Sequence, residues 1–326
     1  MEMIIFNNPH YVRSISVSPD GKMIAFGVLP TGKKGTKDPL IVVRSFTGET
    51  IFEQRFNDQT WTQIHCVQFS PDGRYLACGL SDGGVFVYNT ETWQILGEKA
   101  AYKNAVNVIS FHQGFSGELL LASGSTDVIV VRRITDHLGD PIQTFSGPKY
   151  GLFGLTFHKA RKNLFLAAGD GDGVLWLWNV VSGNLVSSAP LRLEKSGAIW
   201  NIVSLNASRM LAATQMGKIY LIKFAKNILT AEKSIFAIQG CIFALAISRS
   251  KGFLASGGTS GQVVLHNLIS AKEPLKAFDG HADYVWAVTF TPDGKKLLSA
   301  SDDGTVRMWD LKHPESNEEP QEKCRI

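Results

Sequence analysis

The stretch SASDDGTVRMWD, residues 299–310, decides the fold of this 326-residue chain. It follows Gly280-His281 and the segment YVWAVTFTPDG at 284–294. Short runs of β-branched and aromatic residues alternate here with turns of Asp and Gly, which is typical of antiparallel strands joined by tight hairpins. Only a polar tail, KHPESNEEPQEKCRI at 312–326, comes after it, so this unit lacks its last strand in sequence order.

Similar units recur along the chain about 45 residues apart, a period typical of repeat proteins built from small sheets. Three units carry a Pro-Asp-Gly turn, at 19–21, 71–73 and 292–294, in which proline presets the turn and glycine takes the position where a side chain would clash. The apolar residue that closes the first strand of each unit falls at Val17, Phe69, Phe111, Phe157, Leu205, Ile247 and Phe290. Four strands per unit and no helical pattern predict an all-β, seven-bladed β-propeller with four-stranded antiparallel blades.

The chain resembles the WD40-repeat family over residues 2–311, most specifically in its last unit, where Gly280-His281, LLSASDDG and Trp309-Asp310 fit the family pattern. The resemblance implies a buried hydrogen-bonded tetrad made by His281, Ser299, Asp303 and Trp309. The other units are degenerate, and at the position of Trp309 they carry Arg44, Tyr88, Arg132, Trp178, Ile222 and His266.

We expect the N-terminus to supply the missing strand of the last unit. MIIFNNPHYV at 3–12 aligns with LKAFDGHADYV at 275–285, so residues 2–6 should complete the last blade and remove an open sheet edge. We expect one propeller domain over 1–311 and a disordered polar tail over 312–326. The blades are expected at about 10–56, 61–100, 104–147, 148–190, 196–237, 240–280 and 281–311 plus the strand 2–6.

Catalytic and metal-binding patterns are missing from the sequence. It has no HExxH, GxSxG or GxxxxGK[ST] motif, and its four cysteines, Cys66, Cys78, Cys241 and Cys324, form no CxxC pair. GDGDG at 169–173 falls where every unit has its second hairpin turn. We therefore expect no enzyme activity, no cofactor and no metal. Without a signal peptide or an apolar run of about 18 residues, the protein is expected inside the cell, in the cytoplasm, the nucleus or both.

A partner is expected at one end of the central channel. Members of the resembled family commonly bind peptides at the face where the innermost strands begin, and the residue after the first apolar anchor of each such strand should point there. These residues are Arg13, His65, Asn107, Phe153, Asn201, Phe243 and Trp286. Exposed aromatic side chains are typical binding hot spots. The alternative is that Phe153 and Phe243 pack between blades.

A lysine-rich loop at 29–39 belongs to the first unit, and the resemblance places it on the same face as Arg13. Lys33, Lys34 and Lys37 are either solvated or favour an acidic or phosphorylated partner. We thus expect a monomeric, non-enzymatic scaffold or adaptor that binds segments or subunits of other proteins. The alternative, drawn from a pI near 8.8 and this loop, is a propeller associated with nucleic acid in an RNA- or chromatin-processing complex.

Overall fold

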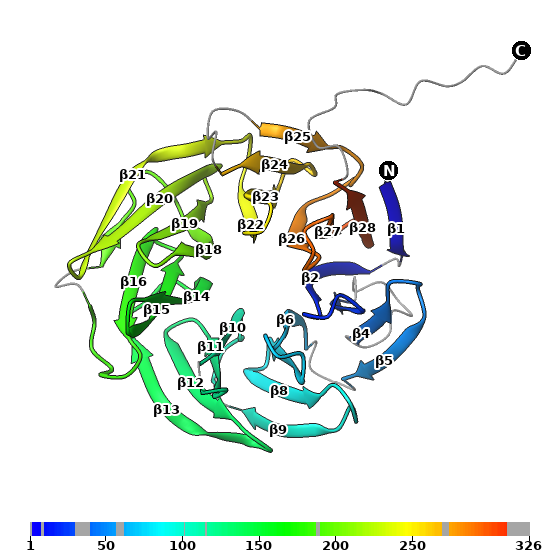
Figure 1. The fold of residues 1–326 in the computed structure, drawn as a ribbon, viewed down its shortest axis with the longest axis horizontal. Coiled ribbons are helices and arrows are strands. Elements are labelled where there is room, and N and C mark those ends of the chain that lie inside the picture. Colours follow the sequence, from blue (N-terminus) through cyan, green and yellow to red (C-terminus); the bar gives the residue numbers. More distant parts are fainter. Residues whose placement is uncertain are drawn as a thin grey trace, which may run out of the picture.

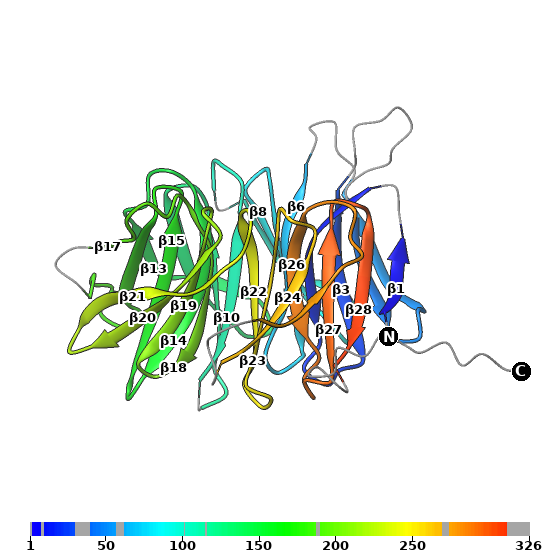
Figure 2. The same cartoon turned by 90° about the horizontal axis from the view of Figure 1, so that it is seen from above.

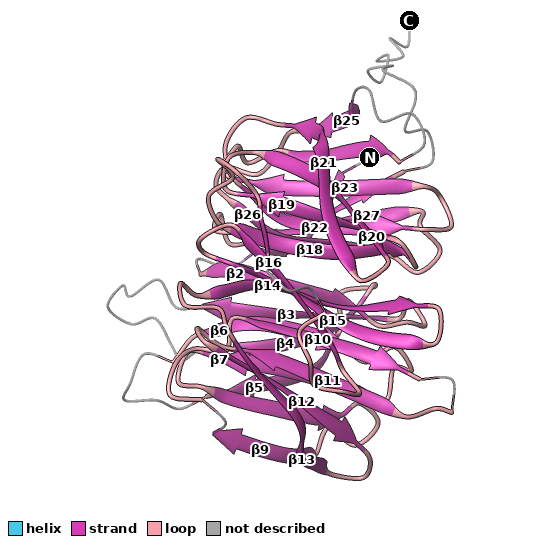
Figure 3. Cartoon of the chain, turned by 90° about the vertical axis from the view of Figure 1, so that its left-hand side faces the viewer, coloured by secondary structure: helices cyan, strands magenta, loops and turns pink. Residues whose placement is uncertain are grey.

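The computed structural model describes residues 2–7, 10–29, 40–56, 62–100, 102–114, 116–186, 190–268 and 274–311. Within these ranges the chain forms seven sheets of four antiparallel strands and no helix (Figure 3). Figure 1 shows the sheets arranged as blades around a ring, with the first strand of each continuous blade innermost. The predicted all-β propeller with seven blades is confirmed.

Six blades are continuous in sequence. Blade one contains β2 (Tyr11–Val17), β3 (Met23–Leu29), β4 (Leu40–Ser45) and β5 (Thr50–Arg55); blade two contains β6 (Ile64–Phe69), β7 (Tyr75–Leu80), β8 (Gly84–Asn89) and β9 (Ile95–Ala100). Blade three contains β10 (Val108–Gln113), β11 (Leu119–Gly124), β12 (Val128–Ile134) and β13 (Leu138–Ser146); blade four contains β14 (Leu152–Ala160), β15 (Asn163–Asp170), β16 (Val174–Asn179) and β17 (Leu191–Arg192). Blade five contains β18 (Ile199–Asn206), β19 (Arg209–Thr214), β20 (Lys218–Ala225) and β21 (Ile228–Ala237); blade six contains β22 (Ile242–Ser248), β23 (Phe253–Gly258), β24 (Val263–Asn267) and β25 (Pro274–Phe278).

The outer strand of blade four differs from the expected range. We expected this blade to end at residue 190, but β17 comprises Leu191–Arg192 and pairs with the start of β16. Before it, Leu185 makes an isolated bridge to Trp178. Up to residue 186, where the described range ends, the segment that was expected to supply the outer strand makes this one bridge, and the strand itself lies just beyond the expected boundary.

Blade seven joins the two ends of the chain. β26 (Val285–Phe290), β27 (Lys296–Ser301) and β28 (Thr305–Asp310) are completed by β1 (Glu2–Asn7), which pairs antiparallel with β28. Figures 1 and 2 both show β1 beside β28. Phe6 is buried, and its ring lies 4.6 Å from that of Phe26 in blade one. The N-terminal strand thus closes the ring as predicted, and it leaves β28 with no open edge.

The hydrophobic core lies between the blades. At each interface the first strand of one blade packs against the second strand of the blade before it. Residues of that second strand must therefore be small enough for the side chains of the next blade to fit. A Cβ atom added to Gly79 would lie 2.6 Å from Val106 of the next blade. Gly27, Gly124, Gly169 and Gly257 meet their neighbours equally closely. Small residues in the second strands therefore allow adjacent sheets to pack in contact.

The three Pro-Asp-Gly turns share one geometry. In the first, the Ser18 hydroxyl donates to Asp20 Oδ1 at 2.6 Å, the same oxygen accepts the Lys22 N–H at 3.0 Å, and Gly21 has a φ of +72°. Asp72 and Asp293 repeat the hydroxyl bond at 2.6 Å. The aspartate organises each turn from within, as expected for this turn chemistry.

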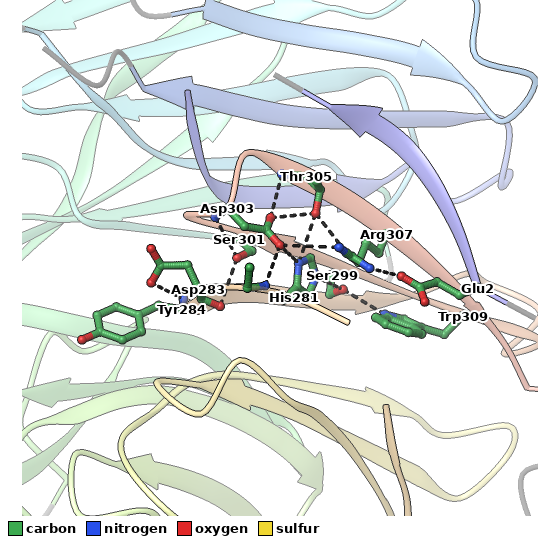
Figure 4. Close-up of polar contacts among 11 residues, drawn as sticks. Glu2, His281, Asp283, Tyr284, Ser299, Ser301, Asp303, Thr305, Arg307 and Trp309 are labelled. Atoms are coloured by element: carbon green, nitrogen blue, oxygen red, sulfur yellow. Dashed lines mark hydrogen bonds and ion pairs between the residues drawn. The ribbon is translucent and has the colours of Figure 1, made fainter. Parts of the chain in front are cut away.

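Blade seven contains a continuous polar chain inside its sheet (Figure 4). His281 Nδ1 lies 2.8 Å from Asp303 Oδ2, His281 Nε2 lies 2.7 Å from Ser299 Oγ, and the Trp309 indole donates to Ser299 Oγ at 2.9 Å. The indole can only donate, so Ser299 Oγ accepts its N–H, and an ionised aspartate can only accept, so His281 Nδ1–H donates to Asp303. Burial raises the pKa of Asp303, but hydrogen bonds from His281 and Thr305 outweigh it and hold the net pKa well below its usual value.

Arg307 connects the closing strand, β1, to the polar chain of blade seven. Its guanidinium donates to Thr305 Oγ1 at 3.1 Å, pairs with Glu2 of β1, and lies 3.8 Å from Asp303 (Figure 4). The guanidinium side chain is only 14% exposed. Closure of the ring and the buried polar chain of blade seven are therefore parts of one network.

The equivalents of Trp309 occupy the same register in every other blade. Trp309 faces Leu297 on the second strand, and the corresponding pairs are Ile24 with Arg44, Leu76 with Tyr88, Leu121 with Arg132, Leu166 with Trp178, Met210 with Ile222 and Leu254 with His266. In blade three the Tyr102 hydroxyl replaces the histidine and lies 2.7 Å from Ser123 Oγ. In blade six His266 Nε2 lies 3.2 Å from Ser256 Oγ.

Acid should destabilise the protein partly through His266. This side chain is buried, its Nδ1 has no hydrogen-bond partner among the described residues, and burial lowers its pKa to about 4. The pKa of His266 is lower in the folded state than in the unfolded state. Its contribution to the free energy of unfolding is therefore fully present above pH ~6.5 and is lost as the pH falls toward ~4. The loss amounts to up to about 3 kcal/mol.

Urea unfolding of wild type and His266→Leu between pH 7 and pH 4 measures this effect. The variant should lose less stability over that range than the wild type. Some pH dependence should remain, because burial also lowers the pKa values of His65, His112 and His158. His137→Gln, at a side chain 69% exposed, is the matched control and should keep the wild-type slope. A wild-type slope in His266→Leu contradicts the assignment.

Candidate functional site

One end of the channel is formed by β-bulges in the innermost strands. In six blades the strand shifts register directly after its first buried apolar residue, as between Val285 and Ala287. A bulged residue is left out of the ladder and its side chain is re-aimed. The bulged residues are Arg13, His65, Phe153, Trp200, Phe243 and Trp286. In blade three Asn107 takes this place, and its N–H donates to the Gly124 carbonyl at 3.0 Å.

These side chains line one cavity of about 900 Å³ that follows the ring axis. All seven residues that the sequence predicted for the channel mouth lie on its wall: Arg13, His65, Asn107, Phe153, Asn201, Phe243 and Trp286. The innermost strands begin at one end of this cavity, and we call that end the mouth.

Trp200 was missed by the sequence analysis. The apolar pattern aligned Leu205 with Phe157, which placed Asn201 at the mouth position of blade five. In the structure Ser204 pairs with Met210, as Phe157 pairs with Leu166, so the strand is offset by one residue. Trp200 is therefore the equivalent of Phe153. Asn201 also lines the cavity, but it pairs with Ala213 in the ladder.

Four aromatic rings from four consecutive blades form a continuous wall at the mouth, which we call the aromatic arc: Phe153, Trp200, Phe243 and Trp286. The ring centroids of Phe153 and Trp200 lie 4.3 Å apart, those of Trp200 and Phe243 lie 5.0 Å apart, and those of Phe243 and Trp286 are stacked at 4.1 Å. Contacts of this kind are worth about 0.5–1.5 kcal/mol each beyond area burial, so the arc is a rigid surface.

Arg13 extends the arc into blade one. Its guanidinium lies 4.6 Å from the Trp286 ring and makes two hydrogen bonds to Asp302, at 2.9 and 3.0 Å. The Asp302 side chain is 8% exposed, so this paired fork is held in place. Arg13 therefore presents a flat face whose charge is already balanced.

The opposite wall of the mouth is polar. His65 and Asn107 come from blades two and three, between Arg13 of blade one and Phe153 of blade four. Burial, and then the charge of Arg13, lower the pKa of His65, so its imidazole is neutral at pH 7. The mouth therefore has an apolar side and an uncharged hydrogen-bonding side.

The two interpretations of Phe153 and Phe243 do not exclude each other. Phe243 is 9% exposed and contacts rings of both adjacent blades, so it packs between blades while lining the cavity. More exposed apolar side chains border the mouth in the connections around it: Tyr284 is 44% exposed, Met216 is 62% exposed and Tyr150 is 67% exposed. Exposed apolar residues gathered beside a cavity are common at the binding surfaces of proteins.

Several sequence predictions concern residues outside the described ranges. These are Lys33, Lys34 and Lys37 of the basic loop, Cys324, and the polar tail at 312–326.

Among the described residues no three His, Cys, Asp or Glu side chains converge as a metal site. Cys66 and Cys78 are buried, and burial raises the pKa of the Cys66 thiol to about 12. Asp170 of the GDGDG segment is buried, where it accepts the Val174 N–H at 2.9 Å and the Trp176 indole N–H at 2.9 Å. That segment therefore acts as a hairpin turn. Across the same ranges, no helix has the length and apolar character that crossing a membrane requires.

Comparison with known proteins gives similarities of two kinds. The model of the WD domain, G-beta repeat, matches residues 52–89 and 272–310. The chain is 24% identical to nuclear distribution protein nudF of Aspergillus niger over 87% of this chain and 66% of that protein. It is 44% identical to target of rapamycin complex subunit wat1 of Schizosaccharomyces pombe, over 22% of each chain, and 23% identical to cell division cycle 20.1, cofactor of APC complex, of Arabidopsis thaliana, over 78% of this chain and 55% of that protein.

Solved structures share the whole fold. The structure of U3-55K matches with a TM-score of 0.77 at 17% identity, over 95% of this chain and 98% of that one. A chain of the mitotic checkpoint complex matches with a TM-score of 0.75 at 18% identity, over 95% of this chain and 90% of that one. The matches span less than two thirds of the length of each curated relative named above: 66% of nudF, 55% of cell division cycle 20.1 and 22% of wat1.

Proposed function

We propose that this chain, which belongs to the WD40-repeat family of β-propellers, is a non-enzymatic scaffold that binds a short segment of a partner protein across its channel mouth. The aromatic arc carries this proposal. Four touching rings at the end of a cavity of about 900 Å³ bury large apolar area at small entropic cost, as hot-spot residues do.

The two sides of the mouth suit an extended peptide. One large apolar side chain of the partner would lie against Trp200, Phe153 and Phe243. The backbone beside it would reach His65 and Asn107, which offer both donors and acceptors. Among the described residues of the mouth wall, Arg13 is already paired with Asp302, so the bound segment is expected to be apolar or aromatic at its centre.

The comparisons support a place in a multiprotein complex. Two of the curated relatives are described as a complex subunit and as a cofactor of a complex, and one matching structure is of a complex. We infer the same for this chain, with the propeller itself monomeric and acting in the cytoplasm or the nucleus.

Affinity capture with mass spectrometry from the native cell tests this function. A variant with Trp200→Asp and Trp286→Asp should lose specific partners more than about tenfold, because two charges replace the apolar wall. Lys22→Glu, on an exposed turn at the other end of blade one, is the matched control and should keep them. Circular dichroism should show both variants folded. Retention of every partner by the folded mouth variant overturns the proposal.

A further inference from the structure

The end of the channel away from the mouth is unevenly charged. There the turn between the first and second strands of blades one, two and seven contains an aspartate and, two residues later, a cation: Asp20 with Lys22, Asp72 with Arg74 and Asp293 with Lys295. The corresponding turns of blades four, five and six, at 159–163, 206–209 and 249–252, contain no acidic residue. They carry six cations: Lys159, Arg161, Lys162, Arg209, Arg249 and Lys251. All of these except Lys159 are exposed, so three adjacent blades present a basic surface.

A second cavity, of about 700 Å³, opens at this basic surface. Lys159 and Arg249 line it together with His112 of blade three and Asn206 of blade five. None of the residues on its wall is an aspartate or a glutamate. A concave site with several nitrogen donors and no carboxylate is matched by an anion.

Two donors of this cavity, Arg249 and His112, are held in place. Arg249 Nη2 donates to the Ser204 carbonyl at 2.6 Å, which fixes the guanidinium by one of its five N–H groups. His112 lies against the Phe157 ring, with centroids 5.4 Å apart. Burial, and then the charge of Lys159, lower the pKa of His112, while Glu118 acts in the opposite direction and is itself paired with Arg133. The positive charge of Lys159 therefore acts on the His112 imidazole across the cavity wall.

We propose that this cavity binds the phosphoryl group of a phosphoserine or phosphothreonine in a partner protein. Lys159, Arg249 and His112 would hold the phosphate oxygens, and the flanking Arg161, Lys162 and Arg209 would attract acidic residues on either side of it. A single-stranded nucleic acid fits less well, because the aromatic residues on the wall, Phe111 and Phe157, are each only 8% exposed and offer no face for base stacking.

Fluorescence anisotropy tests this site with two fluorescein-labelled acidic peptides that differ only in a central phosphoserine or serine. The full-length protein should bind the phosphopeptide at least about tenfold more tightly, a difference of about 1.4 kcal/mol. Lys159→Glu with Arg161→Glu should remove that preference without disturbing the Arg249 bond to Ser204. Lys22→Glu, on the Asp20 turn at the same end of the channel, is the matched control and should keep it.

Nuclear magnetic resonance locates the site. The His112 ring signals should shift when the phosphopeptide is added and not when the serine peptide is added, while those of exposed His137 should stay in place. Equal affinity for the two peptides, equal loss in Lys22→Glu, or tighter binding of a labelled oligouridylate would each overturn the proposal. The Trp200→Asp, Trp286→Asp variant should bind the phosphopeptide normally, so failure here is distinguishable from failure of the mouth.

Discussion

Replacing Trp309 with alanine should lower the free energy of unfolding by about 3–5 kcal/mol, which is the cost of truncating a large buried aromatic residue. Trp309 is 3% exposed, and its ring lies 5.2 Å from that of Phe278. The change opens a cavity in the interface between blades six and seven and removes the donor to Ser299. Urea unfolding followed by circular dichroism measures the loss.

Trp309→Phe separates the two causes. This variant keeps most of the packing and loses the indole N–H, so it should cost about 1–3 kcal/mol, the range expected when a buried partner is left unsatisfied. Loss of no more than about 0.5 kcal/mol in Trp309→Ala, as at an ordinary surface position, would contradict the role of the polar chain in blade seven.

Replacing Trp200 with serine should weaken binding of the partner segment at least about thirtyfold, which corresponds to a hot-spot loss of about 2 kcal/mol. Trp200 contacts Phe153 and Phe243 and joins the two halves of the aromatic arc. The measurement is isothermal titration with the segment identified by capture, made as a synthetic peptide.

Asn201→Ala is the matched control for Trp200→Ser, because the two residues are neighbours on β18 and both line the cavity. We expect this control to change affinity less than about threefold, or about 0.6 kcal/mol. The reverse order of effects would show that the offset found in β18 does not set the binding surface.

The fold could be predicted because its signals are local. Pro-Asp-Gly turns and strands of β-branched residues specify each hairpin within about twenty residues, and repetition of the unit then specifies a ring. The register of the third strands could also be predicted from the sequence. Even in blade one, where an insertion separates β3 from β4, Arg44 pairs with Ile24 as Trp309 pairs with Leu297.

The site could be predicted only in part. A bulge leaves no mark in an apolar pattern, so counting from Leu205 selected Asn201 and missed Trp200. Contacts between distant positions could not be predicted from the repeat pattern either: Arg13 is paired with Asp302 from the other end of the chain, which balances its charge. The basic cavity around Lys159 and Arg249 arises from turns of three consecutive blades, which lie about 45 residues apart in sequence and come together only when the blades pack side by side.

Site-specific photo-crosslinking in the native cell tests the central claim, that the mouth holds the partner. Benzoylphenylalanine is placed at Tyr150, which is 67% exposed beside the aromatic arc, or at Lys22, whose side chain is 81% exposed at the other end of the channel. We predict that one partner is crosslinked from Tyr150 and not from Lys22, and that Trp200→Asp abolishes this crosslink. Crosslinking of the partner from Lys22 alone, or unchanged crosslinking from Tyr150 in Trp200→Asp, would contradict it.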